Sequence, residues 1–379
     1  MKSYFPIYDT YPDLIYMDNA STTHKPYDVI NAVNTFYETS NANIGRWVYK
    51  LAHKAEDQYD AARVIVKNYF WSDPIFVSNA TAWFNMIAHS LVYSGILWPW
   101  SSIILSVSEH HANIVPRQQL SVLHHFDIKR CRVSISGHID TEHLYELCDH
   151  TVSVVSITWA SNVLGVINDI SRIKLIVWNR ILVVDASQLA VHHPNMYGDI
   201  MICTGHKMMW YAGSWVVCMR PNLIKSLTPW VWGGWAIQDV SVSGHTFRTD
   251  IQRREAGTPD VGAAISLWAA CTFLSSHELI DLDPLIDYLW IQLESIWATI
   301  LWQPDHRVPL ISFVIDWNIV YIAEQLAQHN ICVRVWWHCA HPLSHFLGIW
   351  PTIRLSLYYY NTMEDCTKFI SVLRLILWK

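Results

Sequence analysis

The stretch Ile181-Leu182-Val183-Val184-Asp185-Ala186-Ser187-Gln188 decides the fold. Its first four residues form a short apolar run without glycine or proline, which is typical of a strand buried on both faces of a parallel sheet. A second such run, residues 200–203, ends in Thr204-Gly205-His206-Lys207. Open α/β sheets bind ligands at the carboxyl ends of their strands, so we expect Asp185 and Lys207 to face one crevice.

These side chains match the needs of pyridoxal phosphate (PLP). Its aldehyde requires a lysine for covalent attachment, its pyridinium nitrogen requires a carboxylate that keeps the ring protonated, and its phosphate requires hydroxyl and N–H donors. Taken singly, Lys207 is as easily a surface lysine and Asp185 a cap at a strand end. Their joint occurrence at this spacing, with Gln188 and His206 beside them, favours a PLP site.

Length and composition limit the possible functions. The 379 residues, 52% of them apolar, suit one large domain and one smaller domain. A net charge of −6 gives no electrostatic reason to expect nucleic acid or an anionic membrane as a partner. The eight cysteines form no C-x-x-C pair, so we expect reduced thiols in a cytoplasmic protein and no metal site. The amino terminus does not resemble a signal peptide, and no apolar run reaches the length of a membrane span.

Strand-like and helix-like segments alternate along most of the chain. Strands are expected over residues 75–77, 103–107, 152–158 and 181–184, and helices over residues 26–40, 52–69 and 170–177. This alternation predicts an α/β fold with a mainly parallel sheet. We expect an amino-terminal arm (residues 1–25) that packs with the small domain, a large PLP-binding domain (residues 26–262) and a small carboxyl-terminal domain (residues 263–379).

Several longer motifs resemble one known family. They are Tyr16-Met17-Asp18-Asn19-Ala20, Glu109-His110-His111-Ala112-Asn113-Ile114-Val115-Pro116, Ser161-Asn162-Val163-Leu164-Gly165 and Arg254-Glu255-Ala256-Gly257-Thr258-Pro259, together with residues 184–188 and 204–207. Over nearly its whole length the chain resembles the SUF-type (group II) cysteine desulfurases, in the class V branch of fold-type I PLP enzymes. The resemblance implies a large domain with a mainly parallel seven-stranded sheet flanked by helices, and a smaller α+β domain with a catalytic cysteine loop.

The resemblance also assigns roles to individual residues. Lys207 attaches PLP, Asp185 pairs with the ring nitrogen, and His110 stacks on the ring and takes part in proton transfer. The other implied cofactor contacts are Gln188, Ala80, Thr81, Thr204, His206 and Thr258. The implied substrate contacts are Asn162, Arg334, Arg354 and Arg46.

Some of these assignments carry further consequences. Thr258 is expected to reach the phosphate bound by a partner subunit, which implies a homodimer with shared active sites. Ala80 replaces one of the family's two threonines, and without the resemblance we would interpret this loop as a plain helix N-cap. Arg46 matches the family, but Gly45 and Tyr49 stand where the family has histidines.

Cys339 discriminates among the reactions that PLP supports, because the fold does not choose among them. It follows His338 in an irregular stretch before Pro342, and a mobile loop with a neighbouring imidazole suits a reactive thiol. Together with the family pattern R-x-G-H-H-C-A, this predicts a cysteine desulfurase. Such an enzyme converts L-cysteine to L-alanine and keeps the sulfur as a persulfide, here on Cys339.

The resemblance implies partners as well as chemistry. The family passes sulfur to a small shuttle protein and the SUF scaffold for iron–sulfur cluster assembly, so we expect such partners here. The alternatives are a selenocysteine lyase, another class V aminotransferase-like enzyme, and an inactive scaffold protein.

Tryptophan is unusually frequent in this chain. The 21 tryptophans outnumber the 13 glycines, which reverses ordinary usage. Eight tryptophans occupy positions where the family usually has glycine: Trp47, Trp83, Trp100, Trp210, Trp215, Trp232, Trp317 and Trp336. Glycine serves where φ is positive or where the backbone must approach a ligand. We hypothesise that these tryptophans are UGA codons that the host reads as glycine; a genuinely Trp-rich natural or engineered protein is the alternative, and would favour the inactive scaffold.

Overall fold

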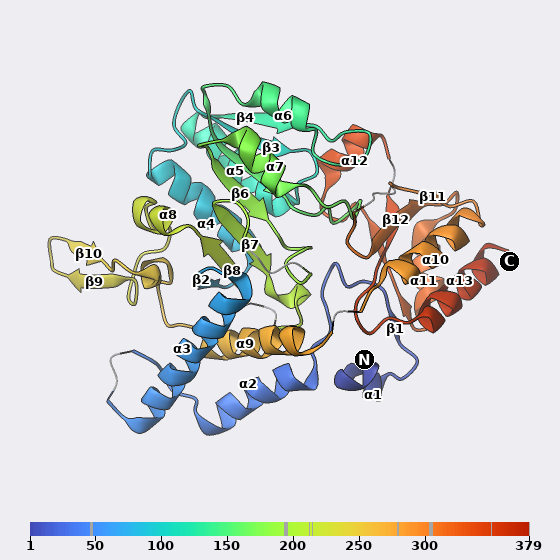
Figure 1. Ribbon diagram of the computed structural model, residues 1–379, viewed down its shortest axis with the longest axis horizontal. Helices are drawn as coiled ribbons and strands as arrows, with labels where there is room; N and C mark the ends of the chain where they lie inside the picture. The colour runs from blue at the N-terminus through green and yellow to red at the C-terminus, as the bar shows by residue number, and fades with distance from the viewer. Residues whose placement is uncertain are drawn as a thin grey trace.

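A seven-stranded sheet forms the centre of the computed structural model, which describes residues 1–45, 48–192, 196–211, 213, 215–278, 280–302, 306–349 and 351–378 (Figure 1). In spatial order the strands are β2 (Pro74–Val77), β8 (Trp215–Met219), β7 (Ile200–Thr204), β6 (Ile181–Asp185), β5 (Val152–Thr158), β3 (Ser102–Ser106) and β4 (Asp127–Cys131). β8 runs antiparallel to both neighbours, and the other neighbouring pairs are parallel. The expected mainly parallel seven-stranded sheet is confirmed.

Alternate residues of the central strands enter two apolar cores, one on each face of the sheet. In β6, Leu182 and Val184 belong to one core, and Val183 belongs to the other. The residues of β7 alternate in the same way. Burial on both faces explains why these two strands read as continuous apolar runs in the sequence.

Helices cover both faces of this sheet (Figure 1). They are α2 (Tyr27–Thr39), α3 (Lys50–Phe70), α4 (Ala80–Tyr93), α5 (His111–His124), α6 (Thr141–Leu147), α7 (Ile170–Val177), α8 (Pro221–Ser226) and α9 (Val261–Ser276). Side chains of α3, α6, α7 and α9 enter one core, and those of α4, α5 and α8 enter the other. The helices expected over residues 26–40, 52–69 and 170–177 are α2, α3 and α7.

The carboxyl-terminal part has its own antiparallel sheet, with strand order β11 (Thr299–Ile300), β12 (Leu310–Val314), β15 (Thr352–Ser356) and β14 (Arg334–Trp336). Helices α10 (Asp283–Glu294), α11 (Ile319–Gln328) and α13 (Met363–Leu377) pack against it around a separate apolar core. A short helix, α12 (His341–Leu347), follows the loop that contains Cys339. This mixed unit is the α+β part of the expected fold class.

The amino-terminal arm contacts both parts of the molecule. It contains η1 (Lys2–Tyr4), α1 (Ile7–Thr10) and β1 (Ile15–Tyr16), and β1 pairs in parallel with β13 (Ile331–Cys332). Phe5 packs in the core of the large sheet, whereas Ile15 and Met17 belong to the carboxyl-terminal core. The domain division expected from the sequence stays a prediction. Since α9 packs against α2 and α3, this packing favours a boundary after α9.

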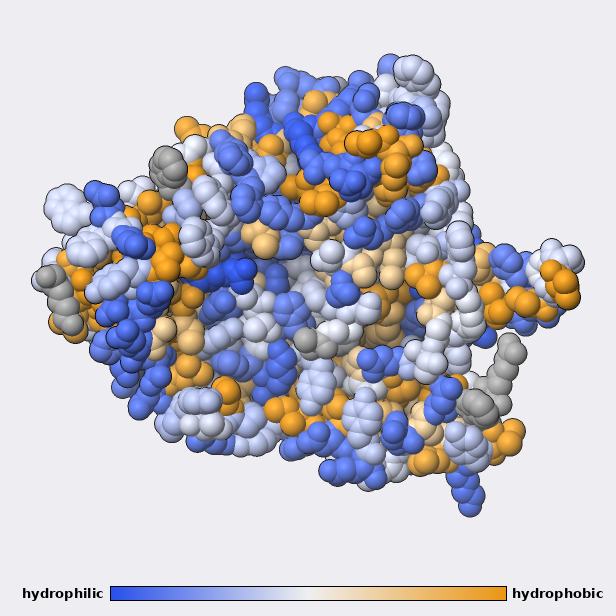
Figure 2. Space-filling view, turned by 180° about the vertical axis from the view of Figure 1, so that it is seen from behind, coloured by the Kyte–Doolittle hydropathy of each residue, from blue (hydrophilic) through white to orange (hydrophobic). Residues whose placement is uncertain are grey.

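An antiparallel hairpin projects from the large part of the molecule (Figure 1). It consists of β9 (Ile237–Val240) and β10 (His245–Phe247), and the short helix η3 (Ile251–Arg254) follows it. Val240 and Val242 are exposed, and Figure 2 shows the hairpin as a lobe beyond the body with hydrophobic residues on it. In the ranges that the structure describes, no helix combines the length and apolarity needed to cross a membrane.

Seven tryptophans adopt a left-handed backbone within the described residues, with φ between 54° and 93°. They are Trp71, Trp100, Trp178, Trp235, Trp297, Trp302 and Trp336. Together they are more than half of the twelve non-glycine residues described with positive φ. Trp71, for example, ends α3 as its left-handed C-cap, although its side chain is 80% exposed. A left-handed conformation costs an L-residue roughly 1–2 kcal/mol, and an exposed indole gains no burial that offsets this cost.

The eight tryptophans singled out from the sequence divide into groups. Trp100 and Trp336 are left-handed, and Trp47 lies outside the described residues. Trp83 and Trp215 each bury an indole N–H that finds no hydrogen-bond partner among the described residues, which also costs free energy. The other three, Trp210, Trp232 and Trp317, do not have positive φ.

Candidate active site

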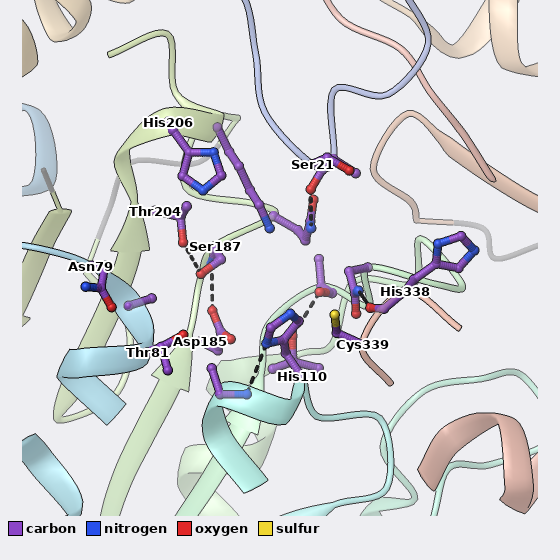
Figure 3. A pocket seen from close by; sticks show the side chains of 18 of the residues that line it. Ser21, Asn79, Thr81, His110, Asp185, Ser187, Thr204, His206, His338 and Cys339 are labelled. Atoms are coloured by element: carbon purple, nitrogen blue, oxygen red, sulfur yellow. Dashed lines mark hydrogen bonds between the residues drawn. The ribbon is translucent and has the colours of Figure 1, made fainter. Parts of the chain in front are cut away.

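A cavity of about 310 Å³ lies where the carboxyl ends of β5, β6 and β7 meet the amino ends of α4 and α5 (Figure 3). The Cys339 loop and strands β14 and β15 close its other side. Twelve of the residues predicted from the sequence line this cavity: Ala80, Thr81, His110, Asn162, Asp185, Gln188, Thr204, His206, Lys207, Arg334, Cys339 and Arg354. The fold therefore assembles most of the predicted site.

Neighbouring strands deliver Lys207 and Asp185 to the cavity. Asp185 is the last residue of β6, and Lys207 ends the short helix η2 (Gly205–Lys207) directly after β7. Burial lowers the pKa of the Lys207 amine to about 8, although the Asp185 carboxylate opposes this shift. Ser187 N–H donates to Asp185 Oδ1 at 3.0 Å and orients the carboxylate. An amine with such a lowered pKa is partly neutral near pH 7, and the neutral form is the nucleophile.

His110 is held as a neutral ring at the start of α5. It is the N-cap of this helix, and its Nδ1 accepts a hydrogen bond from Ala112 N–H at 3.1 Å. Burial, followed by the positive charge of Lys207, lowers the pKa of His110 to about 4. Because Nδ1 accepts, the ring proton is on Nε2.

The amino end of α4 borders the opposite wall of the cavity. Asn79 caps the helix through Oδ1, which accepts from Ala82 N–H at 2.7 Å. Ala80 and Thr81 follow in the first turn and line the cavity. Free N–H groups and the positive end of the helix dipole favour a phosphate at such a position.

A hydroxyl pair lies beside Asp185. Thr204 Oγ1 donates to Ser187 Oγ (Figure 3). Ser187 was not predicted as a site residue, although its place two residues after a strand-ending aspartate was a usable signal. Gln188 Nε2 donates to the Ala20 carbonyl at 3.1 Å, so the amino-terminal arm borders the site as well.

Two arginines of the carboxyl-terminal part point into the cavity from paired strands. Arg354 is buried, and its Nη2 lies 3.0 Å from Asp18 Oδ1 and 2.9 Å from Ser21 Oγ. Arg334 Nη1 donates to the same Ser21 Oγ at 2.8 Å. Sequence reasoning missed Asp18 and Ser21 as site residues, because only the tertiary structure places the polar run 18–23 beside these guanidinium groups.

The Cys339 loop closes the cavity with a left-handed backbone at Trp336, His338 and Cys339. Asn162 Nδ2 donates to the His338 carbonyl at 2.6 Å. The buried His338 ring interacts through Nε2 with Thr352 Oγ1 at 2.8 Å, and Figure 3 shows this ring directed away from Cys339. Burial lowers the pKa of His338 to about 2. The imidazole that precedes the thiol in sequence thus anchors the loop at Thr352, and the expected contribution of a neighbouring imidazole to the reactivity of Cys339 stays a prediction.

One predicted residue that the structure describes does not line this cavity. Thr258 is exposed and lines a separate cavity of about 250 Å³ with Ser78 and Arg254. Arg46 lies outside the described residues. Within the ranges that the structure describes, no group of three or more His, Cys, Asp or Glu side chains is suited to a metal ion.

Comparison with known proteins identifies the family. The family model of the class V aminotransferases (Aminotransferase class-V) matches residues 15–369. The chain belongs to this family. A protein of Xylella fastidiosa (strain Temecula1 / ATCC 700964) named probable cysteine desulfurase is 33% identical over 375 residues, which cover 95% of this chain and 90% of that protein. A cysteine desulfurase of Yersinia pseudotuberculosis serotype O:1b (strain IP 31758) is 30% identical over 379 residues, covering 96% of this chain and 93% of that one.

Solved structures agree with this class V aminotransferase assignment. The apo cysteine desulfurase from Thermococcus onnurineus NA1 superposes with a TM-score of 0.92 at 26% identity, covering 100% of this chain and 98% of that chain. The S-sulfonic acid form of the cysteine desulfurase CsdA from Escherichia coli has a TM-score of 0.89 at 26% identity, covering 100% and 97%.

Class V aminotransferases depend on PLP, and the cavity of this chain fits that cofactor. Lys207 supplies an amine of lowered pKa, Asp185 supplies a carboxylate at the neighbouring strand end, and the α4 terminus supplies N–H donors. The predicted cofactor is confirmed at the level of the family. The roles of the individual residues stay predictions.

Proposed function

We propose that the protein is a PLP-dependent cysteine desulfurase of the SUF type, which converts L-cysteine to L-alanine and keeps the sulfur as a persulfide on Cys339. The observation that carries the proposal is the position of Cys339, whose thiol lines the same cavity as Lys207 and Asp185. Transamination, decarboxylation and racemisation need no thiol at that position, whereas removal of sulfur does. The cysteine desulfurases among its relatives support the same activity.

The arginine pair is proposed to bind the substrate carboxylate. Guanidinium groups hold carboxylates by paired, charge-assisted hydrogen bonds. Arg354 and Arg334 have their side chains oriented by Ser21, and Arg354 also by Asp18. This arrangement would leave the substrate's sulfur on the side of the cavity that the Cys339 loop closes.

The proton and sulfur chemistry then follows from the remaining groups. Bound PLP withdraws electrons from the α-carbon of the amino acid. We assign removal of the α-proton to Lys207 Nζ and proton movement on the cofactor side to the neutral His110 ring. The Cys339 thiolate attacks the substrate sulfur, so that an S–S bond forms and the C–S bond breaks. The electron pair of the broken bond stays on the substrate carbon, which takes up a proton and gives alanine.

The proposal also covers the oligomeric state of the protein and the proteins that accept its sulfur. We propose a cytoplasmic homodimer in which the exposed Thr258 of one subunit faces the phosphate site of the other. The exposed apolar hairpin β9–β10 supports an interface with a second copy. A sulfur-accepting shuttle protein and the SUF scaffold are the proposed consumers of the persulfide, for iron–sulfur cluster assembly.

The test combines cofactor binding with product analysis. Purified protein with PLP is expected to show the visible absorbance of lysine-bound cofactor, and L-cysteine is expected to alter the spectrum and release alanine. Cys339→Ala should abolish persulfide and alanine while retaining the cofactor spectrum. The control Cys148→Ala changes a partly buried cysteine remote from the cavity and should remain active.

The other outcomes decide among the alternatives. Cofactor binding without alanine release would refute the desulfurase proposal, and faster turnover of selenocysteine than of cysteine would indicate a selenocysteine lyase. A folded protein that does not bind PLP would favour the inactive scaffold.

A further inference from the structure

His111 connects the amino end of helix α5 with Cys339 and with His341, the first residue of α12. Its backbone N–H donates to the Cys339 carbonyl at 2.9 Å. Its Nε2 lies 3.0 Å from His341 Nδ1 and accepts from the backbone N–H of His341 at 3.3 Å. The two imidazole rings stack with centroids 4.8 Å apart at 28°. The His111 side chain thus binds His341, and the His111 backbone N–H binds the carbonyl of Cys339.

This connection matters because the loop conformation is strained. Trp336, His338 and Cys339 have φ of 93°, 49° and 59°, a region that L-residues adopt only when surrounding contacts enforce it. Asn162 and Thr352 hold the His338 end of the loop through its carbonyl and its ring. The His111–His341 pair holds the other end, next to the first turn of α12.

The pair has a defined protonation requirement. A hydrogen bond between His341 Nδ1 and His111 Nε2 needs a proton on one nitrogen and a lone pair on the other. The titratable groups around the pair are His110 on α5, Cys339 in the loop and His345 on α12. His345 is linked to the pair by the Trp337 ring, which stacks on both His341 and His345. Burial, followed by the charge of His341, lowers the pKa of His111. A proton added to His111 Nε2 would face two donors, the backbone N–H and the Nδ1–H of His341. Acid conditions therefore weaken the contact between His111 and His341.

We propose that His111 is a positioning residue that fastens the Cys339 loop to helix α5 through His341 and so keeps the thiol directed at the substrate sulfur. The inference rests on the proposed desulfurase function, but it concerns a residue that does not line the cofactor cavity itself. Two neighbouring residues at the amino end of α5 then have separate roles. His110 lines the cofactor cavity, and its neighbour His111 holds the nucleophile's loop.

The experiment compares His111→Ala and His111→Gln with the control His345→Ala in the PLP-loaded protein. His345 stacks on Trp337 but makes no described hydrogen bond to the loop. We expect His111→Ala to lower the rate of persulfide formation about tenfold, since small displacements of a reacting group are costly, with little change in KM for cysteine or in the cofactor spectrum. His111→Gln, whose amide oxygen can accept from His341, should recover part of the rate, and His345→Ala should match the wild type.

The pH profile and thiol labelling separate positioning from general stability. The pKa of His111 is lower in the fastened loop than its ordinary value of about 6.5, so fastening is complete above that pH and weakens as pH falls below it. The wild-type rate should therefore fall on the acid side, and His111→Gln should flatten that limb. Alkylation of Cys339 by iodoacetamide, followed by mass spectrometry of its peptide, should be several-fold faster in His111→Ala.

Two results would overturn the proposal. One is a His111→Ala protein whose persulfide and alkylation rates equal those of His345→Ala. The other is a variant that loses the cofactor spectrum along with the rate, because that would indicate general damage. If the wild-type protein releases no alanine, the proposed function fails, yet the alkylation rates still test whether His111 fastens the loop.

A different observation carries a second inference, about the tryptophans. The backbone at the seven left-handed tryptophans has the conformation that glycine adopts without steric cost. The side chains of Trp71, Trp100, Trp178 and Trp297 are 74–92% exposed, so packing does not force them into it. We infer that these seven positions are glycine in the protein that the native host makes, encoded by UGA. Backbone geometry and side-chain exposure support this assignment without reference to any family pattern.

The gene and the native protein test this inference independently of activity. All seven codons should be UGA, and peptides from the protein isolated from its host should carry the mass of glycine at these positions. A UGG codon at any of the seven, or a tryptophan mass in those peptides, would overturn the inference for that position.

Discussion

At the scale of single residues, the backbone conformation of several tryptophans conflicts with their side chains. Trp71 follows the last turn of α3, and its N–H donates to the Lys67 carbonyl as in a glycine C-cap. Such caps are usually glycine because a Cβ crowds the left-handed conformation. The chain therefore keeps the backbone pattern of a glycine cap while the written sequence supplies the largest side chain.

Replacing Trp71 by glycine should stabilise the protein by about 1 kcal/mol, because the left-handed strain disappears and little burial is lost. Urea unfolding monitored by circular dichroism measures the change. Trp290→Gly is the matched control: this tryptophan is 9% exposed within α10, and its Nε1 donates to Glu294, so its loss should cost about 3 kcal/mol or more. Equal effects at both positions would refute the strain argument.

Lys207 gives a pH prediction at the same scale. Its pKa is lowered to about 8 by burial, so the neutral amine that attacks an aldehyde increases as pH rises through that value. The rate at which the apo protein acquires the visible absorbance of bound PLP should rise from pH 7 to pH 9 and then level off. A rate that keeps rising to pH 10.5, as for an ordinary lysine, would contradict the lowered pKa.

At the scale of elements, helix starts bring the polar groups to the site. Asn79 caps α4 and His110 caps α5, and both residues line or border the cavity. The local sequence explains these helix starts, because an acceptor side chain satisfies N–H groups that have no helical partner. The site lies at these amino ends because the strands before them end at the same edge of the sheet.

Asn79→Ala should lower the free energy of unfolding by about 1 kcal/mol and also weaken PLP binding, since the first turn of α4 is part of the proposed phosphate site. Asn318→Ala is the control, because Asn318 caps α11 through Val320 N–H and Tyr321 N–H at 3.1 Å, away from the cavity. Both variants should lose similar stability by urea unfolding, and equilibrium dialysis should show weaker PLP binding for Asn79→Ala alone. Equal retention of PLP would remove α4 from the proposed phosphate site.

At the scale of the whole molecule, the amino-terminal arm ties two cores together across the active site. Asp18 and Ser21 come from the arm, Arg354 and Arg334 from the carboxyl-terminal sheet, and Lys207 from the large sheet. The projecting hairpin extends away from this body (Figure 2), and its residues Val240 and Val242 are exposed. An exposed apolar lobe of this kind is typical of an association surface.

The double variant Val240→Lys and Val242→Lys should shift the protein from dimer to monomer, because two charges would be buried in the proposed interface. Analytical ultracentrifugation measures the change, and circular dichroism checks that the fold is retained. A second double variant, Val122→Lys and Leu123→Lys, places the same charges on exposed positions of α5 and should remain dimeric. A monomeric wild-type protein would refute the homodimer.

Much of the fold was predictable because its signals are local. The apolar runs of β6 and β7 and the helical spacing of α2 and α7 depend on neighbouring residues only. The packing of α9 on the large part was not predictable in this way. Apolar residues occur on every face of this helix, so the spacing of apolar residues could not predict which of the two cores it would join.

By itself, the sequence determined the chemistry at the strand ends. Asp185 ends one buried strand and Lys207 follows the end of the next, and parallel strands present their carboxyl ends at one edge. The tertiary structure alone decided what surrounds them. It turned the His338 ring toward Thr352, joined Ser21 to both arginines and Asp18 to Arg354, and set His111 against the loop of Cys339. These contacts join residues that are far apart in the chain. They depend on how the two cores pack against each other, and a local sequence pattern carries no information about that packing.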